Sequence, residues 1–327
     1  KESLSLLNQL RLFAKAGKSV VLITHKLREA FSHADIVTIL RNGKTVDSGL
    51  SPDSMTAEQL SQLMVGKAKE YTKIQFAPPG KVVLTLSDVQ ARRDNGLNAL
   101  DAFNLNLCAG QVYGLAGVGG NGQTELAEIL MGIRHMNKGS FELNGRQLKK
   151  PSPKMLRRKG ITCVPAERYR YGLAGDLSVM ENAVITHLGS GRFGTAGWVN
   201  RRRIFGDTAN VIKEHSIHGA DPRTRARLLS GGNAQKLVLS RELAGKANIL
   251  LAHSPTRGLD VRACAAMHEA LRNASRNGTA VLLLSEDLDE IFAISDRIGV
   301  INSGRIVGEF EAPADRAKIG HLMVSIS

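Results

Sequence analysis

Short apolar runs, separated by longer stretches of mixed residues, dominate the hydrophobic pattern of this chain. They lie at residues 20–23, 111–116, 249–252 and 281–284. Continuous apolar runs of this length are typical of strands buried on both faces, so they predict a parallel sheet. They fall far short of the ~20 residues that a membrane-spanning helix needs. Amphipathic stretches and turn residues follow the runs, and the pattern therefore indicates an α/β fold.

One segment of the pattern occurs twice. Residues 17–46 match residues 278–307 without a gap, at an offset of 261 residues (278 − 17). Both copies predict a buried strand, a short amphipathic helix and a hairpin with Asn42-Gly43 or Ser303-Gly304 at its turn. The identical pairs are Leu22/Leu283, Leu27/Leu288, Glu29/Glu290, Phe31/Phe292, Asp35/Asp296 and Gly43/Gly304. We therefore expect the chain to be the back end of a tandem duplication.

The repeat also predicts the domain boundaries. We expect residues 1–66 to form the C-terminal tail of a first domain and residues 83–327 to form a complete second domain. Residues 67–82 lack a sustained period and contain several lysines and Pro78-Pro79, a composition that suits an exposed linker.

A glycine-rich stretch follows the apolar run at 111–116 and precedes a helical pattern. This context supports a phosphate-binding loop of the form G-x-x-x-x-G-K-[ST], although an ordinary glycine-rich turn remains the alternative. Glycines let backbone amides converge on phosphate oxygens, and the helix N-terminus adds a positive dipole. Gln123 replaces the lysine and supplies no charge, whereas Thr124 keeps the hydroxyl that would meet Mg²⁺. The candidate phosphate-binding residues are Gly117, Gly119, Gly120, Asn121, Gly122, Gln123, Thr124 and Glu125.

A more specific motif is LLSGGNAQK at residues 228–236. A helix N-cap at Ser230 would explain the serine and glycines but not the whole string. The motif resembles the signature of ABC ATPases. The sequences VPAERYRYGL (164–173), LSVMENAVI (177–185) and PTRGLD (255–260) extend the likeness over nearly the whole chain. It is most similar to the tandem ATPase subunits of simple-sugar and nucleoside importers.

This resemblance implies the fold and several roles. The fold would be a P-loop NTPase core of the ABC ATPase type, with a parallel sheet, an antiparallel β subdomain and a helical signature subdomain. The signature would reach the γ-phosphate bound by the opposite domain, and Asp260 would end the D-loop. The signature residues are Ser230, Gly231, Gly232, Asn233 and Gln235. ATP and Mg²⁺ are the implied cofactors, with Thr124 on the metal.

Several positions depart from the family pattern. His253 replaces the aspartate that would organise Mg²⁺, and Ser254 replaces the glutamate that would polarise water. Glu286 replaces a histidine, and Ala166, beside Glu167, replaces a glutamine or glutamate. No convincing aromatic side chain precedes the phosphate loop to stack on adenine; Arg92, Arg93 and Asn95 stand there instead. We therefore expect this site to bind ATP weakly and to hydrolyse little.

The first copy keeps the histidine, as His25 in Thr24-His25. The resemblance implies that His25 is catalytic. Its site would take the phosphate loop from an upstream domain and the signature from the second copy.

Charge and composition add two constraints. The chain has 44 Lys and Arg against 30 Asp and Glu, a net charge of +14, but only 4% aromatic residues. Single-stranded nucleic-acid binders interleave basic and stacking residues, so we interpret the basic runs as solvated surface and expect no nucleic-acid partner. Three separated cysteines favour a reducing compartment, and no signal peptide opens the chain.

The sequence thus predicts a cytoplasmic ATPase subunit, peripheral on the inner face of the cell membrane. Its expected partners are transmembrane permease subunits, the upstream nucleotide-binding domain and, indirectly, a solute-binding protein. Two alternatives stay open: a soluble tandem ABC ATPase acting on nucleic acid or ribosomes, favoured by the positive charge, and a non-catalytic regulatory module, favoured by the degenerate site.

Overall fold

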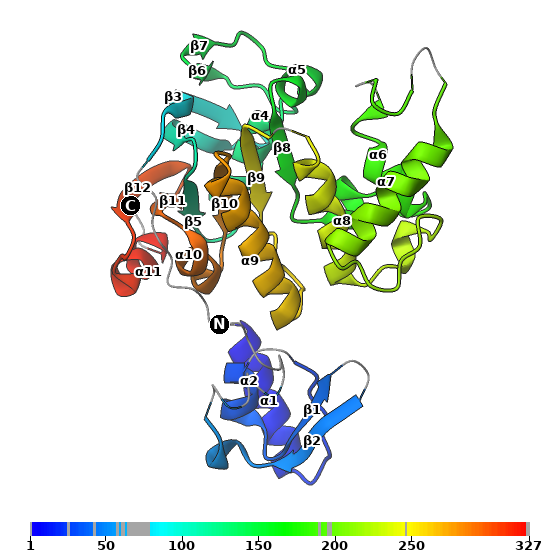
Figure 1. The fold of residues 1–327 in the computed structure, drawn as a ribbon. Coiled ribbons are helices and arrows are strands. Elements are labelled where there is room, and N and C mark those ends of the chain that lie inside the picture. The colour runs from blue at the N-terminus through cyan, green and yellow to red at the C-terminus, as the bar shows by residue number, and fades with distance from the viewer. Residues whose placement is uncertain are drawn as a thin grey trace. The chain divides into compact units, whose positions relative to one another are not determined.

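The chain forms two compact units, the first made mainly of residues 1–74 and the second mainly of residues 75–327. The computed structural model describes residues 2–24, 27–41, 44–56, 59, 63, 79–188, 191–194, 198–245 and 247–324. His25 and most of the expected linker lie outside these residues. Figure 1 shows the elements of both units.

A six-stranded sheet forms the centre of the second unit, in the order β12-β11-β5-β10-β9-β8. All strands but β12 are parallel, as the continuous apolar runs predict. Every residue of β5 and β10 is buried, because these strands lie inside the sheet and both their faces are covered. The strands are β5 (Val112–Ala116), β8 (Ile161–Val164), β9 (Ile249–His253), β10 (Ala280–Ser285), β11 (Arg297–Asn302) and β12 (Arg305–Glu311).

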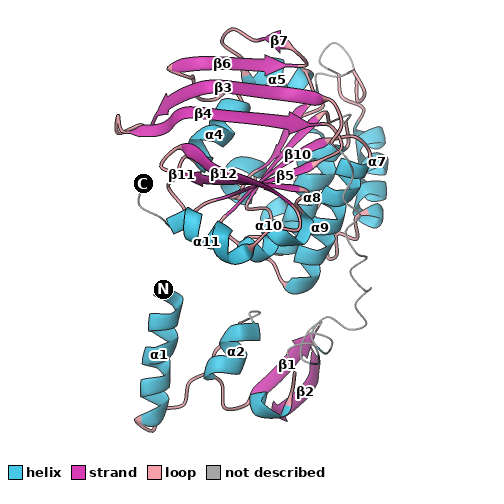
Figure 2. Cartoon of the chain, turned by 90° about the vertical axis from the view of Figure 1, so that its left-hand side faces the viewer, coloured by secondary structure: helices cyan, strands magenta, loops and turns pink. Residues whose placement is uncertain are grey.

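A second, antiparallel sheet lies as a separate layer over the first (Figure 2). Its order is β4-β3-β6-β7, with β3 (Val82–Arg92), β4 (Asn98–Cys108), β6 (Lys138–Leu143) and β7 (Arg146–Gln147). One apolar core joins the two layers: Phe103 and Phe141 from this sheet pack in a cluster with Leu126 and Leu130 of helix α4 and with Leu282 of β10.

Helices cover the sheet and form a lateral group. They are α4 (Gln123–Leu130), α5 (Pro153–Arg158), α6 (Val179–Val184), α7 (Arg201–Glu214), α8 (Gly231–Leu243), α9 (Val261–Arg276), α10 (Leu288–Ile294) and α11 (Arg316–Val324). Figure 1 shows α6, α7 and α8 gathered beside the sheet. Ser178, Asn200 and Ser230 cap these three helices through their side-chain oxygens. The parallel core, antiparallel sheet and helical group are the fold class expected from the sequence. Within the described residues, no helix is long and apolar enough to cross a bilayer.

The first unit repeats part of this fold. It contains α1 (Glu2–Lys15), α2 (Leu27–His33), β1 (Val37–Arg41) and β2 (Lys44–Leu50). Shifted by 261 residues, α2 and β2 take the bounds of α10 and β12.

A repeated polar contact supports this correspondence. Arg11 Nη1 donates to Asp35 Oδ1 at 2.6 Å and to the His33 carbonyl at 3.2 Å. At the same offset, Arg272 Nη1 donates to Asp296 at 2.8 Å and to the Ile294 carbonyl at 3.1 Å.

The expected strand at Val20–Ile23 is wrong for this chain. These residues form no strand, and the Val21 and Ile23 side chains are 89% and 93% exposed. The counterpart, β10, is hydrogen-bonded on both edges, by β5 and β9. Shifted by 261 residues, those two neighbours would fall before residue 1. A buried strand needs partners on both sides, and the described part of the first unit offers none at this segment.

A matched pair of substitutions tests this difference. Val20 is 39% exposed, whereas its counterpart Val281 is fully buried. We expect Val281→Thr to lower the free energy of unfolding by about 1–3 kcal/mol, because it buries a hydroxyl group in the sheet. Val20→Thr should change it by less than ~0.5 kcal/mol. Urea denaturation followed by circular dichroism measures both, and equal losses would show that Val20 is packed like a strand residue.

Candidate nucleotide-binding site

The carboxyl ends of three neighbouring strands define the candidate site. β5 leads into the phosphate loop (residues 117–124), β9 into loop 254–260, and β10 into Glu286. Because these strands are parallel and adjacent, their loops emerge at the same edge of the sheet. Ligands of open α/β sheets bind at such an edge.

The phosphate loop has the backbone that its glycines allow. Gly120 and Gly122 have φ of +88° and +108°, in the left-handed region, and α4 begins directly after Gly122. Asn121 fastens the loop to the β11–β12 hairpin: its side-chain oxygen accepts from the Ser303 amide and its carbonyl from the Gly304 amide, both at 3.1 Å. Thr124 is exposed in the first turn of α4. The loop is thus fixed, with a hydroxyl at the helix N-terminus.

Gln123 turns back into the loop. Its side chain is 6% exposed, and its Nε2 donates to the Val118 carbonyl at 3.1 Å. A Cβ on Gly117 would lie only 2.7 Å from the same nitrogen. The amide therefore stabilises the loop from inside and adds no positive charge to it.

Glu286 lies against the same loop. One of its carboxylate oxygens is 2.7 Å from the place that a Cβ on Gly119 would occupy. The structure thus brings together two residues that the sequence singled out separately. A carboxylate at this place repels phosphate oxygens, whereas a histidine there could donate to them.

The end of β9 carries no carboxylate. Burial and the neighbouring Arg257 lower the pKa of His253, which therefore stays neutral at neutral pH. Ser254 has φ of +44°, and its amide donates to the Leu284 carbonyl at 2.8 Å. A neutral imidazole and a hydroxyl bind hard cations poorly, so the residues present fit Mg²⁺ badly. The described residues likewise contain no group of three or more His, Cys, Asp or Glu side chains that could hold a metal ion.

Glu290 fastens loop 254–260 to α10. Its side chain is buried, and its two oxygens accept from Thr256 Oγ1 at 2.7 Å and Ser285 Oγ at 2.6 Å. His268 Nε2 lies 3.5 Å from the same carboxylate. The sequence analysis assigned no role to Glu290. The identical residue at the equivalent position of the first copy, Glu29, was the signal that could have indicated one.

The signature turn (residues 229–233) starts α8. Ser230 is exposed at the N-cap, and its hydroxyl accepts from the Asn233 amide at 3.4 Å. The Asn233 side chain donates to the His218 carbonyl at 2.7 Å and accepts from the His218 amide at 3.2 Å. Gly231 and Gly232 are half-buried, whereas Gln235 is only 1% exposed and lies within the core. The helix N-terminus with Ser230 is therefore open to an anion.

Arg168 joins the signature turn to two other segments. It begins a π-helical turn, Arg168–Gly172, which directly follows Ala166 and Glu167. Its Nη1 donates to the Arg257 carbonyl at 3.2 Å, and its Nη2 is 2.6 Å from the place of a Cβ on Gly231. The neighbouring Tyr169 hydroxyl donates to the Leu229 carbonyl at 2.8 Å. Sequence reasoning missed this contact, because the reach of an arginine side chain leaves no local pattern.

Comparison with known proteins identifies the family. A family model described as ABC transporter matches residues 100–257, which include the phosphate loop, the signature turn and β9. The chain belongs to the ABC transporter family. The matched residues lie in the two-layer second unit.

Two relatives of the chain are longer than the chain itself. The glucose import ATP-binding protein TsgD13 of Haloferax volcanii is 39% identical over 319 residues, which cover 96% of the chain and 58% of TsgD13. The nucleoside import ATP-binding protein NupA of Lactococcus lactis is 36% identical over 313 residues, with 95% and 62% covered. The chain thus spans about three fifths of the length of these relatives.

Solved structures of ABC cassettes share the fold. The ADP conformation of an ATP-binding cassette of an ABC transporter has a TM-score of 0.61 at 17% identity, covering 74% of the chain and 95% of that cassette. A dimeric bacterial ABC transporter cassette also has a TM-score of 0.61, at 21% identity, covering 71% of the chain and all of the cassette. At such identities the likeness concerns the fold alone.

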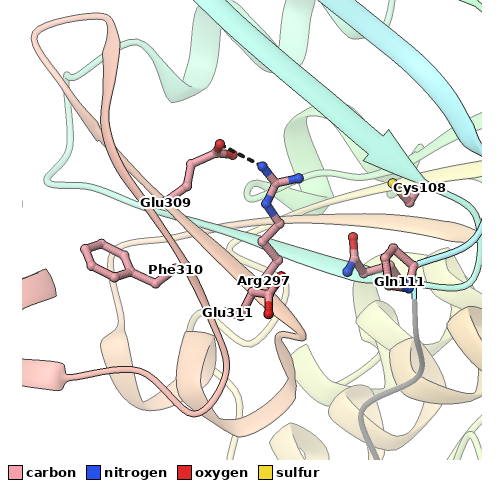
Figure 3. A pocket seen from close by; sticks show the side chains of 7 residues that line it. Cys108, Gln111, Arg297, Glu309, Phe310 and Glu311 are labelled. Atoms are coloured by element: carbon pink, nitrogen blue, oxygen red, sulfur yellow. Dashed lines mark hydrogen bonds and ion pairs between the residues drawn. The ribbon is translucent and has the colours of Figure 1, made fainter.

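The second unit has a cavity away from this edge of the sheet. It has a volume of about 430 Å³ and is lined by Cys108, Gln111, Arg297, Phe310 and Glu311, among others. Gln111 precedes β5 and Arg297 opens β11, so the cavity lies at the amino ends of these strands, opposite the phosphate loop. Figure 3 shows Arg297 extended toward Glu309, which it contacts at 2.7 Å. This cavity is not part of the nucleotide-binding edge.

Proposed function

We propose that the chain is part of an ATP-binding subunit of an ABC importer for simple sugars or nucleosides. Its second unit would lend the signature turn to a hydrolytic site in an upstream nucleotide-binding domain of the same subunit. The names of the relatives, which include glucose and nucleoside import proteins, support the solute class.

One contrast carries this proposal. The signature turn keeps its serine, glycines and capped helix N-terminus. The edge beside the phosphate loop, however, has Gln123, Ser254 and Glu286 where the family has a lysine, a glutamate and a histidine for phosphoryl transfer, and His253 where it has an aspartate for Mg²⁺. Such a domain can complete a neighbour's site while its own site holds nucleotide with little turnover.

The proposal assigns the remaining roles as follows. His25 would act in the upstream site, together with that domain's phosphate loop. Gly117–Thr124 would hold ATP at the second site, and Asp260 would face the upstream domain. Transmembrane permease subunits would hold the subunit peripherally at the cytoplasmic face of the membrane. A solute-binding protein would deliver the solute to these permease subunits.

Turnover measurements test this division of labour. The chain alone is expected to bind ATP but to release phosphate at a rate close to that of a blank. A full-length subunit, with its upstream domain, should hydrolyse ATP in the presence of Mg²⁺. Phosphate release by purified protein measures both. Robust Mg²⁺-dependent hydrolysis by the chain alone would contradict the proposal.

A further inference from the structure

We infer that Arg93 supplies to the phosphates of a bound nucleoside triphosphate the positive charge that Gln123 lacks. This inference rests on the proposed function, because it concerns the nucleotide site assigned to the phosphate loop. Arg93 lies outside the glycine-rich motif and comes from the turn between β3 and β4.

The phosphate loop needs a cation from elsewhere. Residues 117–124 contain no lysine or arginine. Two carboxylates lie beside the loop: Glu286 is at Gly119, and Glu125 is in the first turn of α4. Both repel a triphosphate, which carries several negative charges. The Gln123 amide is held by the Val118 carbonyl and offsets none of this charge.

The structure places Arg93 at this point. Its backbone is fixed by the turn, since its amide donates to the Leu97 carbonyl at 2.8 Å and its carbonyl accepts from the Gly96 amide at 2.9 Å. Its guanidinium donates through Nη2 to the Gly120 carbonyl, and its Nε lies 3.7 Å from a carboxylate oxygen of Glu125. The Arg93 guanidinium therefore lies at the exposed part of the phosphate loop, against Gly120.

The guanidinium can serve the loop and a ligand together. It has five N–H donors, and the contact with Gly120 occupies one of them. The Arg93 side chain is 35% exposed, so further donors can meet solvent or a phosphate oxygen. A fork of donors suits phosphate geometry, and hydrogen bonds between charged groups are about twice as strong as neutral ones. The pairing with Glu125 also reduces the repulsion that this carboxylate exerts on phosphate.

Calorimetric titration of the chain with Mg²⁺-ATP and with AMP tests the inference. Arg93→Gln should lower the affinity for ATP about ten- to a hundredfold, the effect of one charged hydrogen bond, and the affinity for AMP much less. The matched control is Arg146→Gln, which removes the same charge from an exposed side chain in β7 and should change either affinity less than about twofold. Arg93→Lys should keep most of the affinity. Arg93→Gln combined with Gln123→Lys should recover it.

The results distinguish this inference from the proposed function. If wild type binds ATP and Arg93→Gln binds it equally well, the role of Arg93 is refuted while the nucleotide site stands. Equal losses for ATP and AMP, without recovery by Gln123→Lys, would mean that Arg93 only maintains the loop's shape, which also overturns the inference. A wild-type chain that binds neither nucleotide would reject the nucleotide site and the inference together. Melting curves of each variant check that it folds.

Discussion

Ser230→Arg in a full-length subunit is expected to lower ATP hydrolysis by about 10²–10³-fold. Under the proposed function, the N-terminus of α8 donates hydrogen bonds to the γ-phosphate at the upstream site. The substitution removes the capping hydroxyl and places a long side chain over the open helix end. The loss is of the size seen when one donor that stabilises transition-state charge is removed. Steady-state phosphate release measures it.

Two comparisons make this result specific. Asn277→Arg adds the same side chain at an exposed turn after α9 and should leave hydrolysis unchanged. Nucleotide binding at the phosphate loop of the second unit should also persist in Ser230→Arg. Unchanged hydrolysis and transport in Ser230→Arg would instead favour a non-catalytic regulatory module.

Arg272→Met is expected to lower the free energy of unfolding by about 3–5 kcal/mol. Arg272 and Asp296 are both buried, and their side chains meet at 2.8 Å. The same carboxylate accepts from the Val112 amide at 2.7 Å, so it also holds the start of β5. Without Arg272, the buried Asp296 carboxylate loses its charged partner. Urea denaturation followed by circular dichroism gives the change.

The repeat provides the control for this prediction. Arg11→Met removes the equivalent pair in the first unit, where the Arg11 and Asp35 side chains are 41% and 69% exposed. Exposed pairs contribute about 0–1 kcal/mol, because water screens them, so little change is expected. Arg272→Lys keeps the charge without the fork of donors and should be intermediate. Equal effects of the two methionine substitutions would show that burial does not decide the strength of this contact.

Local patterns in the sequence predicted much of the second unit. The buried strands, the glycine-rich loop before α4 and the Ser303-Gly304 hairpin each follow from residues close together in the chain. The strand predicted at Val20–Ile23 does not form, although its apolar pattern matches that of β10. Strand formation depends on pairing with segments that are far away in the sequence. The sequence also did not predict the contacts of Arg93 and Arg168. Both side chains are long and donate hydrogen bonds to carbonyls that are far away in the sequence. Sequence therefore identified the motifs, whereas the contacts between motifs required the structure.

The guanidinium of Arg168 contacts two segments besides its own turn, loop 254–260 at Arg257 and the signature turn at Gly231. Tyr169 and Tyr171, on the same π-helical turn, are 43% and 66% exposed and can be touched from outside. The Tyr169 hydroxyl donates to the Leu229 carbonyl and the Arg168 guanidinium lies against Gly231, so this turn is in direct contact with the signature turn. A partner that contacts Tyr169 would therefore lie one side chain away from the turn that carries Ser230.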